Sequence, residues 1–370
     1  EIMEVLVTGS GGFIGKNLIE RLSRIENIKV HTFDIEDKLE DLVKNIDKID
    51  FIFHLAGINR PQNVDEFYKG NRDTIKDLIS IIEKKELKIP ILVTSSIQVE
   101  RDNDYGKSKL EGENLLREYS TKNNIPIYIY RLPNVFGKWC RPNYNSVIAT
   151  WCNNIANDLE ITVSDRAVKL SLVYIDDVVN TFSKHLTEKI ESKEYYSIPT
   201  IYEKTLGEIL DLLYSFKNNR NDLIINKVGT GFERALYSTY LSYLPKDKFS
   251  YELTEHKDNR GAFVEIIKTL DSGQFSISTS KPGITRGNHY HNTKNEKFLV
   301  IKGEAIIRFR HIYSDEIIEY PVSDKKLEVV DIPVGYTHNI TNTGDSEMIL
   351  VIWANELFDK ENPDTYFLEV

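Results

Sequence analysis

The sequence predicts an α/β Rossmann-type doubly wound parallel sheet followed by an all-β barrel. Buried strands alternate with helical stretches in the first part, a pattern typical of parallel pairing. A glycine-rich turn joins the first strand to a helix. From Phe249 onward, short apolar segments alternate with polar turns, which is typical of a sandwich or barrel. A chain of 370 residues exceeds one typical core. We therefore expect one domain over 1–245, a second over 249–370, and a linker near 244–251.

Composition narrows the classes of function. Hydrophobic residues make up 41% of the chain and charged residues 28%, which is ordinary for a globular protein. The formal net charge of −10 argues against nucleic-acid binding, because phosphate contacts need a basic face. The sequence contains no apolar run of about 18 residues, so we expect no membrane-spanning helix. The chain enters a strand at Glu4, so we expect no signal peptide. Cys140 and Cys152 fit no metal spacing, and we expect free thiols in a reducing cytoplasm.

The first strand and its turn predict a dinucleotide site. Residues 4–8 are expected to form a buried strand, and a helical run continues to about Arg24. Between them lies a T-G-x-x-G-x-x-G pattern with Gly9, Gly12 and Gly15. Glycines permit the tight turn and let a pyrophosphate approach the helix N-terminus. The second strand ends in Asp34, where an acid usually accepts hydrogen bonds from the adenosine ribose 2′-OH.

The next two strands, 50–57 and 89–96, enclose a helical stretch from about Val64 to Lys84. Ligands bind at the carboxyl ends of such strands, and Ser95 and Ser96 lie at one of these ends. Tyr105 and Lys109 open the next helical run and share one face of it. An adjacent ammonium lowers the pKa of a phenol from its usual value of about 10. We therefore expect Tyr105 to exchange protons near neutral pH.

These pieces resemble the extended short-chain dehydrogenase/reductase family over about residues 3–240. The resemblance rests on TGSGGFIG (8–15), HLAG (54–57), Asn71, the paired serines, YGKSK (105–109) and RLPNVFG (131–137). It implies that Tyr105 is the catalytic acid/base, that Lys109 assists it, and that Ser96 hydrogen-bonds the substrate carbonyl, with Ser95 as the alternative. It also implies an NAD(P) site formed by Gly9, Gly12, Phe13, Ile14, Gly15, Asp34, Leu55, Ala56, Gly57, Asn71, Tyr105 and Lys109.

The same resemblance implies a sugar-nucleotide pocket lined by residues 131–137 and 138–147. Lys138 and Arg141 are candidates for binding a diphosphate there, or else solvated loop charges. The stretches 173–179 and 205–216 fit the substrate lobe of the family. The helix-like stretch 236–245 is rich in tyrosine, and we interpret its aromatic rings as packing.

The second domain carries a predicted metal site. Its expected strands are FVEIIKT (263–269), QFSISTS (274–280), KFLVIKG (297–303), EAIIRFRH (304–311), EIIEYPV (316–322), EVVDIP (328–333) and MILVIWAN (348–355). His289 and His291 are two residues apart and would share one face of a strand. With Glu296 and His338 they offer three imidazoles and one carboxylate, a ligand set that suits Zn²⁺.

This pattern resembles the cupin family. The first cupin motif is matched in full from Gly283 to Gly303. The second is matched by Pro333, Gly335, His338 and Asn342, while Leu327 stands where a leading glycine is usual.

Two further segments, 258–265 and 285–291, resemble the dTDP-4-keto-6-deoxyhexose 3,5-epimerase branch of the cupins, which implies that His289 is a catalytic base. A metal-bound imidazole has no free lone pair for that task. Either the base lies elsewhere, or the metal polarises the ketone.

The whole chain resembles a family of two-domain bacterial enzymes of capsule and surface-polysaccharide synthesis. This implies C3 epimerisation of a UDP-2-acetamido-2,6-dideoxy-4-keto-hexose by the cupin domain. Reduction at C4 by the first domain would then give UDP-2-acetamido-2,6-dideoxy-L-talose, a precursor of UDP-N-acetyl-L-fucosamine. The resemblance also implies Zn²⁺ and a homo-oligomer, either a dimer or a dimer of dimers.

Alternatives remain open for the cofactor and for the cupin domain. The resemblance implies NADPH, whereas Asp34 suits the free 2′-OH of NADH, and no basic residue follows it until Lys38. The alternative to a bifunctional enzyme is a single-activity 4-ketoreductase whose cupin domain serves structure or oligomerisation. An oxygen-using metal cupin is a third interpretation, which the reductase domain disfavours.

Overall fold

The computed structural model describes residues 1–57 and 62–370, and the chain forms two compact units. The first unit comprises 1–213 and 230–245, and the second comprises 214–229 and 246–370. The predicted fold class, a Rossmann-type sheet followed by an all-β region, is confirmed. The sequence predicts 214–229 in the first domain, but the structure groups this segment with the second unit. The reason is that β9 (Ile224–Ile225) pairs with β11 (Gly261–Thr269).

The first unit is built on five parallel strands in the order β2-β1-β3-β4-β5. They are β1 (Met3–Thr8), β2 (Ile28–Phe33), β3 (Phe51–His54), β4 (Ile91–Ser96) and β5 (Ile127–Leu132). Most apolar side chains of β1, β3 and β4 are buried, as the continuous hydrophobic runs predicted, whereas those of the edge strand β2 are half-buried. The strand order reverses between β1 and β3, and the loops after these strands meet at the carboxyl edge of the sheet. Ligands of open α/β sheets bind at such a reversal.

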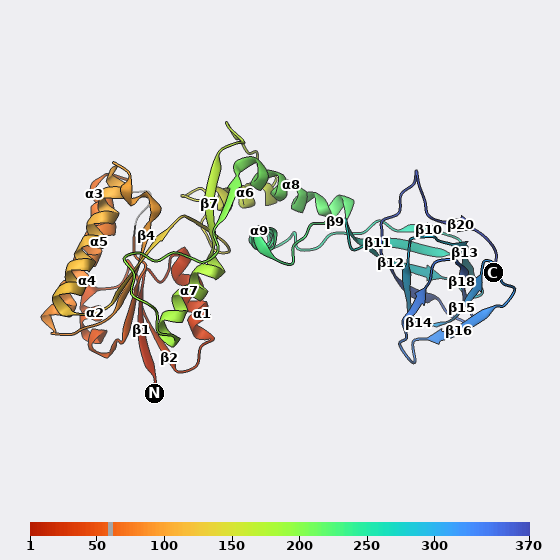
Figure 1. Ribbon diagram of the computed structural model, residues 1–370, viewed down its shortest axis with the longest axis horizontal. Helices are drawn as coiled ribbons and strands as arrows, with labels where there is room; N and C mark the ends of the chain where they lie inside the picture. Colours follow the sequence, from red (N-terminus) through yellow and green to blue (C-terminus); the bar gives the residue numbers. More distant parts are fainter. Residues whose placement is uncertain (58–61) are drawn as a thin grey trace. The chain divides into compact units, whose positions relative to one another are not determined.

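Helices cover both faces of this sheet (Figure 1). One face carries α1 (Phe13–Ser23) and α7 (Ile175–Thr187), and the other carries α2 (Leu39–Asn45), α4 (Thr74–Lys84) and α5 (Asp104–Asn123). The predicted helical stretch 64–84 is divided into α3 (Asp65–Tyr68), the π-helical turn η2 (Lys69–Asp73) and α4. Single π-helical turns are frequent at functional sites, and η2 contains Asn71.

The first unit also contains a small lobe. Its three-stranded sheet consists of β6 (Asn134–Phe136), β7 (Lys169–Tyr174) and β8 (Tyr202–Thr205). The helices α6 (Val147–Ala156) and α9 (Gly231–Ser242) accompany it, and α8 (Leu206–Asp222) runs from the first unit into the second. Short 3₁₀ turns lie at η1 (Ile46–Lys48) and η3 (Ile97–Glu100). The Phe232 ring of α9 packs 5.6 Å from that of Phe136.

The second unit consists of two sheets around an apolar core. One sheet has seven strands, β10-β11-β12-β19-β14-β17 with β9 beside β11, and the other is β16-β15-β18-β13-β20. All pairs are antiparallel except β9 with β11. The strands not yet bounded are β10 (His256–Asp258), β12 (Gln274–Ser280), β13 (Thr285–Tyr290), β14 (Glu296–Lys302), β15 (Glu304–His311), β16 (Ile318–Ser323), β17 (Val330–Ile332), β18 (Tyr336–Asn342), β19 (Met348–Ala354) and β20 (Tyr366–Phe367).

Alternating residues fill the core of the second unit. Phe298, Val300, Ile307, Ile340 and Leu350 are among the buried side chains that fill it. This alternation along the strands is the period-2 pattern from which the barrel was predicted. Among helices within the described residues, none is both long and apolar enough to cross a lipid bilayer.

Candidate functional site

The glycine turn of the first unit leaves no room for side chains. Gly9 has φ +67°, and a Cβ there would lie 2.8 Å from the Ala56 nitrogen, because the loops after β1 and β3 touch. A Cβ at Gly15 would lie 2.3 Å from the Gly9 oxygen. Helix α1 begins after Gly12, and within the described residues no side chain caps it. Its first N–H groups therefore point to where an anionic ligand can bind.

Asp34 lies against this turn, as predicted. Its Oδ2 accepts a hydrogen bond of 2.7 Å from the Gly11 nitrogen, and its Oδ1 accepts one of 2.8 Å from the Ile35 nitrogen. A Cβ at Gly11 would approach Asp34 Oδ2 to 2.1 Å, so a side chain here would displace the carboxylate. The carboxylate is thus fixed to the backbone beside the expected adenosine position.

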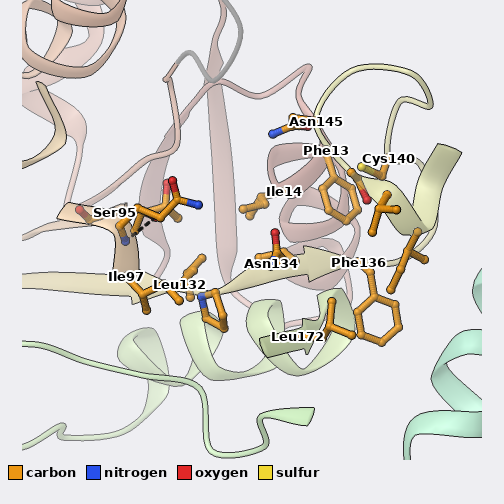
Figure 2. A pocket seen from close by; sticks show the side chains of 18 of the residues that line it. Phe13, Ile14, Ser95, Ile97, Leu132, Asn134, Phe136, Cys140, Asn145 and Leu172 are labelled. Atoms are coloured by element: carbon orange, nitrogen blue, oxygen red, sulfur yellow. Dashed lines mark hydrogen bonds between the residues drawn. The ribbon is translucent and has the colours of Figure 1, made fainter. Parts of the chain in front are cut away.

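A cleft of about 410 Å³ opens beside the carboxyl ends of β4 and β5. Figure 2 shows Ser95 and Ile97 at one end of this cleft and Phe13 and Phe136 at the other. The lining includes the predicted residues Phe13, Ile14, Ser95, Ser96, Tyr105 and Lys109.

The two adjacent serines make different contacts. Ser96 Oγ accepts the Gln98 N–H at 3.0 Å and hydrogen-bonds Tyr105. Ser95 Oγ instead donates a 2.6 Å hydrogen bond to Glu113 Oε2. Ser96 is therefore the serine that accompanies Tyr105.

The predicted effect of Lys109 on Tyr105 is wrong. Burial raises the pKa of Tyr105, and the hydrogen bond with Ser96 offsets this only in part. The Lys109 Nζ donates instead to the Thr94 carbonyl at 3.4 Å. Burial lowers the pKa of Lys109 to about 8, although Glu113 acts in the opposite direction. Tyr105 consequently keeps its proton at neutral pH, which is the form that a proton donor needs.

The remaining predicted cofactor residues lie around Gly57. A Cβ at Gly57 would lie 3.0 Å from Asn71 Oδ1 and 3.2 Å from Lys109 Nζ. Asn71, which is buried in η2, donates a 3.2 Å hydrogen bond to Ser108 Oγ on α5. The loop containing Leu55 and Ala56, η2 and α5 therefore converge on one point at the edge of the sheet.

The two candidate diphosphate ligands lie elsewhere. Lys138 Nζ donates to Asn17 Oδ1 at 2.8 Å and to Asp176 Oδ1 at 3.1 Å, so its charge is already paired within the fold. The Arg141 guanidinium lies 5.3 Å from the centre of the Tyr144 ring. Neither residue belongs to the cleft lining within the described chain.

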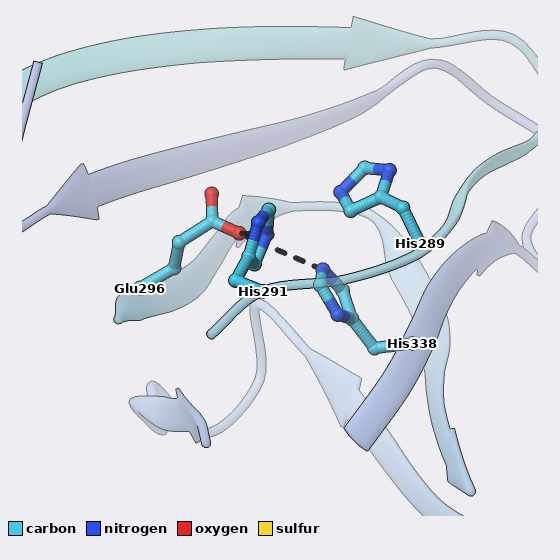
Figure 3. A group of neighbouring side chains, drawn as sticks. All are labelled: His289, His291, Glu296 and His338. Atoms are coloured by element: carbon cyan, nitrogen blue, oxygen red, sulfur yellow. Dashed lines mark hydrogen bonds and ion pairs between the residues drawn. The ribbon is translucent and has the colours of Figure 1, made fainter. Parts of the chain in front are cut away.

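The second unit brings the four predicted metal ligands together (Figure 3). One ligand atom from each of His289, His291, Glu296 and His338 lies within 4.8 Å of all the others. His289 stands opposite His338 in the pairing of β13 with β18. A β-bulge shifts the register between Gly287 and His289, and Asn288 adopts φ +60°. His291 lies just beyond the end of β13, so His289 and His291 do not share one regular strand as predicted.

The electrostatics of this group suit a bound cation. Glu296 Oε1 lies 2.9 Å from His291 Nε2 and 3.6 Å from His338 Nε2. Burial acts to raise the pKa of Glu296, but the neighbouring imidazoles outweigh it and hold the pKa well below its usual range. Burial, and next to it His338, lowers the pKa of His289 to about 4, which keeps this ring neutral.

Within the described residues, neither ring nitrogen of the buried His338 has a hydrogen-bond partner. An unpaired buried imidazole is costly, and a metal ion would satisfy it. The donor set therefore fits Zn²⁺.

A cavity of about 290 Å³ adjoins three of these four side chains. His289, Glu296 and His338 form part of its wall, and Arg286 and Lys294 contribute positive charge. Phe263, Phe298 and Phe358 supply apolar surface. The cavity thus offers room for a small anionic or polar ligand beside the group that could bind a metal.

The comparisons with known proteins give a family match for each part of the chain. Residues 5–198 match the NAD dependent epimerase/dehydratase family, which is more than half of the chain. The chain belongs to the NAD-dependent epimerase/dehydratase family. The family is NAD dependent, so this chain uses a nicotinamide cofactor. Residues 256–366 match the polysaccharide biosynthesis C-terminal domain.

Two relatives are similar over the whole length. The UDP-2-acetamido-2,6-beta-L-arabino-hexul-4-ose reductase of Pseudomonas aeruginosa is 48% identical over 368 residues, covering 100% of this chain and 99% of the relative. The capsular polysaccharide assembling protein CapF of Staphylococcus aureus is 52% identical, with a TM-score of 0.93 and 100% coverage of both chains. The chain is therefore CapF-like in both units. The UDP-glucuronic acid 4-epimerase of Bacillus cereus shares the fold over 58% of this chain and 83% of its own, at 22% identity and a TM-score of 0.52.

Sequence reasoning missed several residues of the two sites. Glu113 follows Tyr105 and Lys109 at steps of four along α5, a spacing that could have indicated it. Gln98 lines the cleft without belonging to any motif considered. The main-chain carbonyl of Asp364 hydrogen-bonds His291, although the two residues are 73 positions apart. No sequence motif near either residue indicates this contact.

Proposed function

We propose that this protein is a bifunctional nucleotide-sugar enzyme of capsule or surface-polysaccharide synthesis. In this proposal, the first unit is a 4-ketoreductase acting on a UDP-2-acetamido-2,6-dideoxy-hexos-4-ulose. The observation that carries the reductase assignment is the meeting of Ser96, Tyr105 and Lys109 in one cleft beside the glycine turn. The full-length similarity to the P. aeruginosa reductase supports the substrate class.

The residues of the first unit have distinct tasks in this reaction. When bound, NADPH supplies the hydride that C4 receives. Tyr105, which burial keeps protonated, donates its proton to the oxygen that becomes the hydroxyl group. Ser96 hydrogen-bonds the same oxygen, and the Gln98 N–H fixes the position of the Ser96 hydroxyl. Lys109 lies at the junction of β4 and Gly57, where its ammonium can bind the cofactor ribose.

In the same proposal, the second unit epimerises C3 of the substrate before reduction. The support is the four-residue group beside a 290 Å³ cavity that also contains Arg286 and Lys294. Zn²⁺ bound by His289, His291, Glu296 and His338 would supply a Lewis acid. The chain's own residues would hold the sugar, and one of them would move the C3 proton. His289 as a metal ligand cannot be that base, because its lone pair is used.

The chemistry fixes the order of the two reactions. The C3–H bond is acidic only while C4 is a ketone, because the carbanion then delocalises into an enolate. Once C4 is an alcohol, the configuration at C3 can no longer change. Epimerisation therefore comes first, and reduction makes its result permanent. The product would be UDP-2-acetamido-2,6-dideoxy-L-talose.

Solvent exchange tests the epimerase assignment. The full-length protein is incubated with the 4-keto substrate in D₂O and without nicotinamide, and C3 is examined by NMR. We expect deuterium at C3. If C3 retains protium, the second unit is a structural or oligomerisation module, and only the 4-ketoreductase assignment stands. A closed four-ligand shell is common in structural zinc sites, which is the specific observation that favours this second candidate.

A further inference from the structure

Asp364 lies beside the turn that separates two of the candidate metal ligands. His291 precedes this turn and Glu296, the first residue of β14, follows it. The side chains on either side are held 2.9 Å apart, from His291 Nε2 to Glu296 Oε1. The geometry of the turn 292–295 therefore determines how these two ligands face each other.

The Asp364 carboxylate binds the backbone of that turn. It accepts hydrogen bonds from three consecutive nitrogens, those of Asn292 at 3.0 Å, Thr293 at 2.7 Å and Lys294 at 2.9 Å. The Thr293 hydroxyl adds a fourth at 3.1 Å. Consecutive N–H groups that converge on one anion form a nest, and the anion fixes their conformation. Asp364 thus supplies, from within the chain, the anion that orders the turn.

The main chain of Asp364 acts on His291 itself. Its carbonyl oxygen lies 2.5 Å from His291 Nδ1, and a carbonyl can only accept, so Nδ1 carries the proton. The Thr365 hydroxyl is a more distant neighbour at 3.4 Å. The other nitrogen, Nε2, faces Glu296 Oε1 at 2.9 Å, so the lone pair of Nε2 and the carboxylate can bind the same cation. Hydrogen bonds of this kind orient metal-binding histidines and select their tautomer.

The segment that carries Asp364 is itself attached to the other ligands. Strand β20 pairs with β13, with Phe367 opposite His289. The Leu368 nitrogen donates to the Asn288 oxygen at 3.0 Å, next to His289. The Thr337 hydroxyl, adjacent to His338, donates to the Leu368 carbonyl. Residues 364–368 therefore contact the chain beside three of the four ligands.

We infer that the Asp364 side chain is a positioning group of the metal site: it holds the turn between His291 and Glu296 and so keeps these two ligands facing each other. This inference rests on the proposed metal binding and not on the proposed epimerase activity. Removing an outer-shell partner of this kind typically weakens metal binding by about 10- to 100-fold.

The test measures zinc affinity on the full-length protein. Wild type, D364A, D364N and D359A are stripped with a chelator and titrated with Zn²⁺ against a chromophoric competitor. We expect D364A to bind Zn²⁺ about 10- to 100-fold more weakly than wild type. In D364N the amide oxygen can still accept from the turn, so its affinity should lie between those of wild type and D364A. D359A is the matched control, because the Asp359 carboxylate accepts only from the nearby Glu361 nitrogen among its described contacts.

The outcomes separate this inference from the assignments on which it rests. Equal zinc affinity in D364A and wild type would overturn the role of Asp364. Absence of stoichiometric zinc in wild type would overturn the metal site itself. Loss of affinity in D364A with recovery in D364N supports the inference even if D364A is less stable, since D364N keeps the shape of the side chain. Reduction of a substrate already epimerised at C3, which does not need the second unit, provides a check that D364A has folded.

Discussion

Ser95 donates a 2.6 Å hydrogen bond to the buried carboxylate of Glu113, while its neighbour Ser96 lies against Tyr105. Arg131 also binds Glu113 through two nitrogens, at 2.8 and 3.1 Å. Two adjacent serines at the end of one strand thus have separate tasks. Ser95 belongs to a buried ion-pair network, and Ser96 faces the cleft.

Replacing the two serines separately tests this division. S96A should lower kcat/KM for ketone reduction about 10²- to 10³-fold, the usual effect of losing one donor to a reacting oxygen. S95A should leave kcat/KM close to wild type but lower the free energy of unfolding by about 1–3 kcal/mol, because a buried carboxylate loses a donor. Steady-state kinetics and denaturant unfolding provide both values. The reverse pattern would assign the catalytic role to Ser95.

Removal of the Tyr105 hydroxyl isolates the proton-transfer step. Y105F should consume the 4-keto substrate about 10²- to 10⁴-fold more slowly than wild type, the range typical for loss of a general acid. NAD(P)H binding, followed by fluorescence, should persist. Deuterium incorporation at C3 should also persist, because it belongs to the second unit. Unchanged ketone consumption in Y105F would contradict the reductase mechanism.

The charge of Lys109 predicts a dependence on pH. Burial lowers its pKa to about 8, so the ammonium is lost as the pH rises through that value. We expect kcat/KM for ketone reduction to fall as the pH rises, with an apparent pKa of about 8. The effect of Lys109 on folding stability has the opposite sign. In the unfolded chain the lysine pKa is 10.5, so between about pH 8 and pH 10.5 the unfolded chain binds more protons than the folded chain. Lys109 therefore makes the free energy of unfolding rise with pH in this range.

The control for this profile is Lys107 on the same helix. Its ammonium pairs with the exposed Asp102 at 3.1 Å. K107Q should leave the alkaline limb where it is. A flat profile of wild type up to about pH 10 would show that Lys109 does not govern the reaction.

Zinc should stabilise the second unit through the four converging ligands. At a free Zn²⁺ concentration 100 times Kd, the expected stabilisation is about 2.7 kcal/mol. H338A and H291A should lose both the bound metal and this stabilisation, as measured by metal analysis and thermal unfolding with and without Zn²⁺. If either variant still exchanges C3 hydrogen in D₂O, the metal is structural. H311A is a suitable control, because His311 lies outside the four-residue group.

Cofactor preference depends on Asp34. We expect NADPH to give the higher kcat/KM because the whole-chain resemblance implies it, although the Asp34 carboxylate by itself suits the free 2′-OH of NADH. Replacing Asp34 by Asn removes a negative charge near a 2′-phosphate and should raise the NADPH to NADH ratio by about tenfold, the effect of about one charge-assisted hydrogen bond. E36Q, which changes a neighbouring charge, should leave the ratio unchanged. A strong preference of wild type for NADH would contradict the assignment.

The fold was predictable from local patterns to a large extent. The predicted buried strands 4–8 and 89–96 correspond to β1 and β4, and the alternating segments after Phe249 form strands of the two sheets of the second unit. The meeting of His289, His291, Glu296 and His338 was predictable because each of the two cupin-like motifs has a characteristic spacing. The pKa of Tyr105 was not, because the sequence shows that Lys109 is adjacent on the helix but not that its ammonium turns to the Thr94 carbonyl.

Contacts between distant parts of the chain were also beyond sequence reasoning. The π-helical turn around Asn71 interrupts a stretch whose periodicity is that of one continuous helix. Asp364 reaches the turn after His291 only because β20 pairs with β13. The bulge at Asn288 shifts His289 against its partner strand, and nothing in the local residue types specifies that shift.

The chain enters the second unit at 214–229 and returns to the first at 230–245. This order limits where the protein can be cut into separate domains. A gene cut at Phe249 would omit β9 and leave the nitrogen of Lys268 without the Leu223 carbonyl that it contacts at 2.8 Å. The edge of β11 would then be open to pairing with other chains, a common cause of aggregation. Poor behaviour of such a fragment in expression trials would reflect this missing strand, and an insoluble barrel would say nothing about its catalytic capacity.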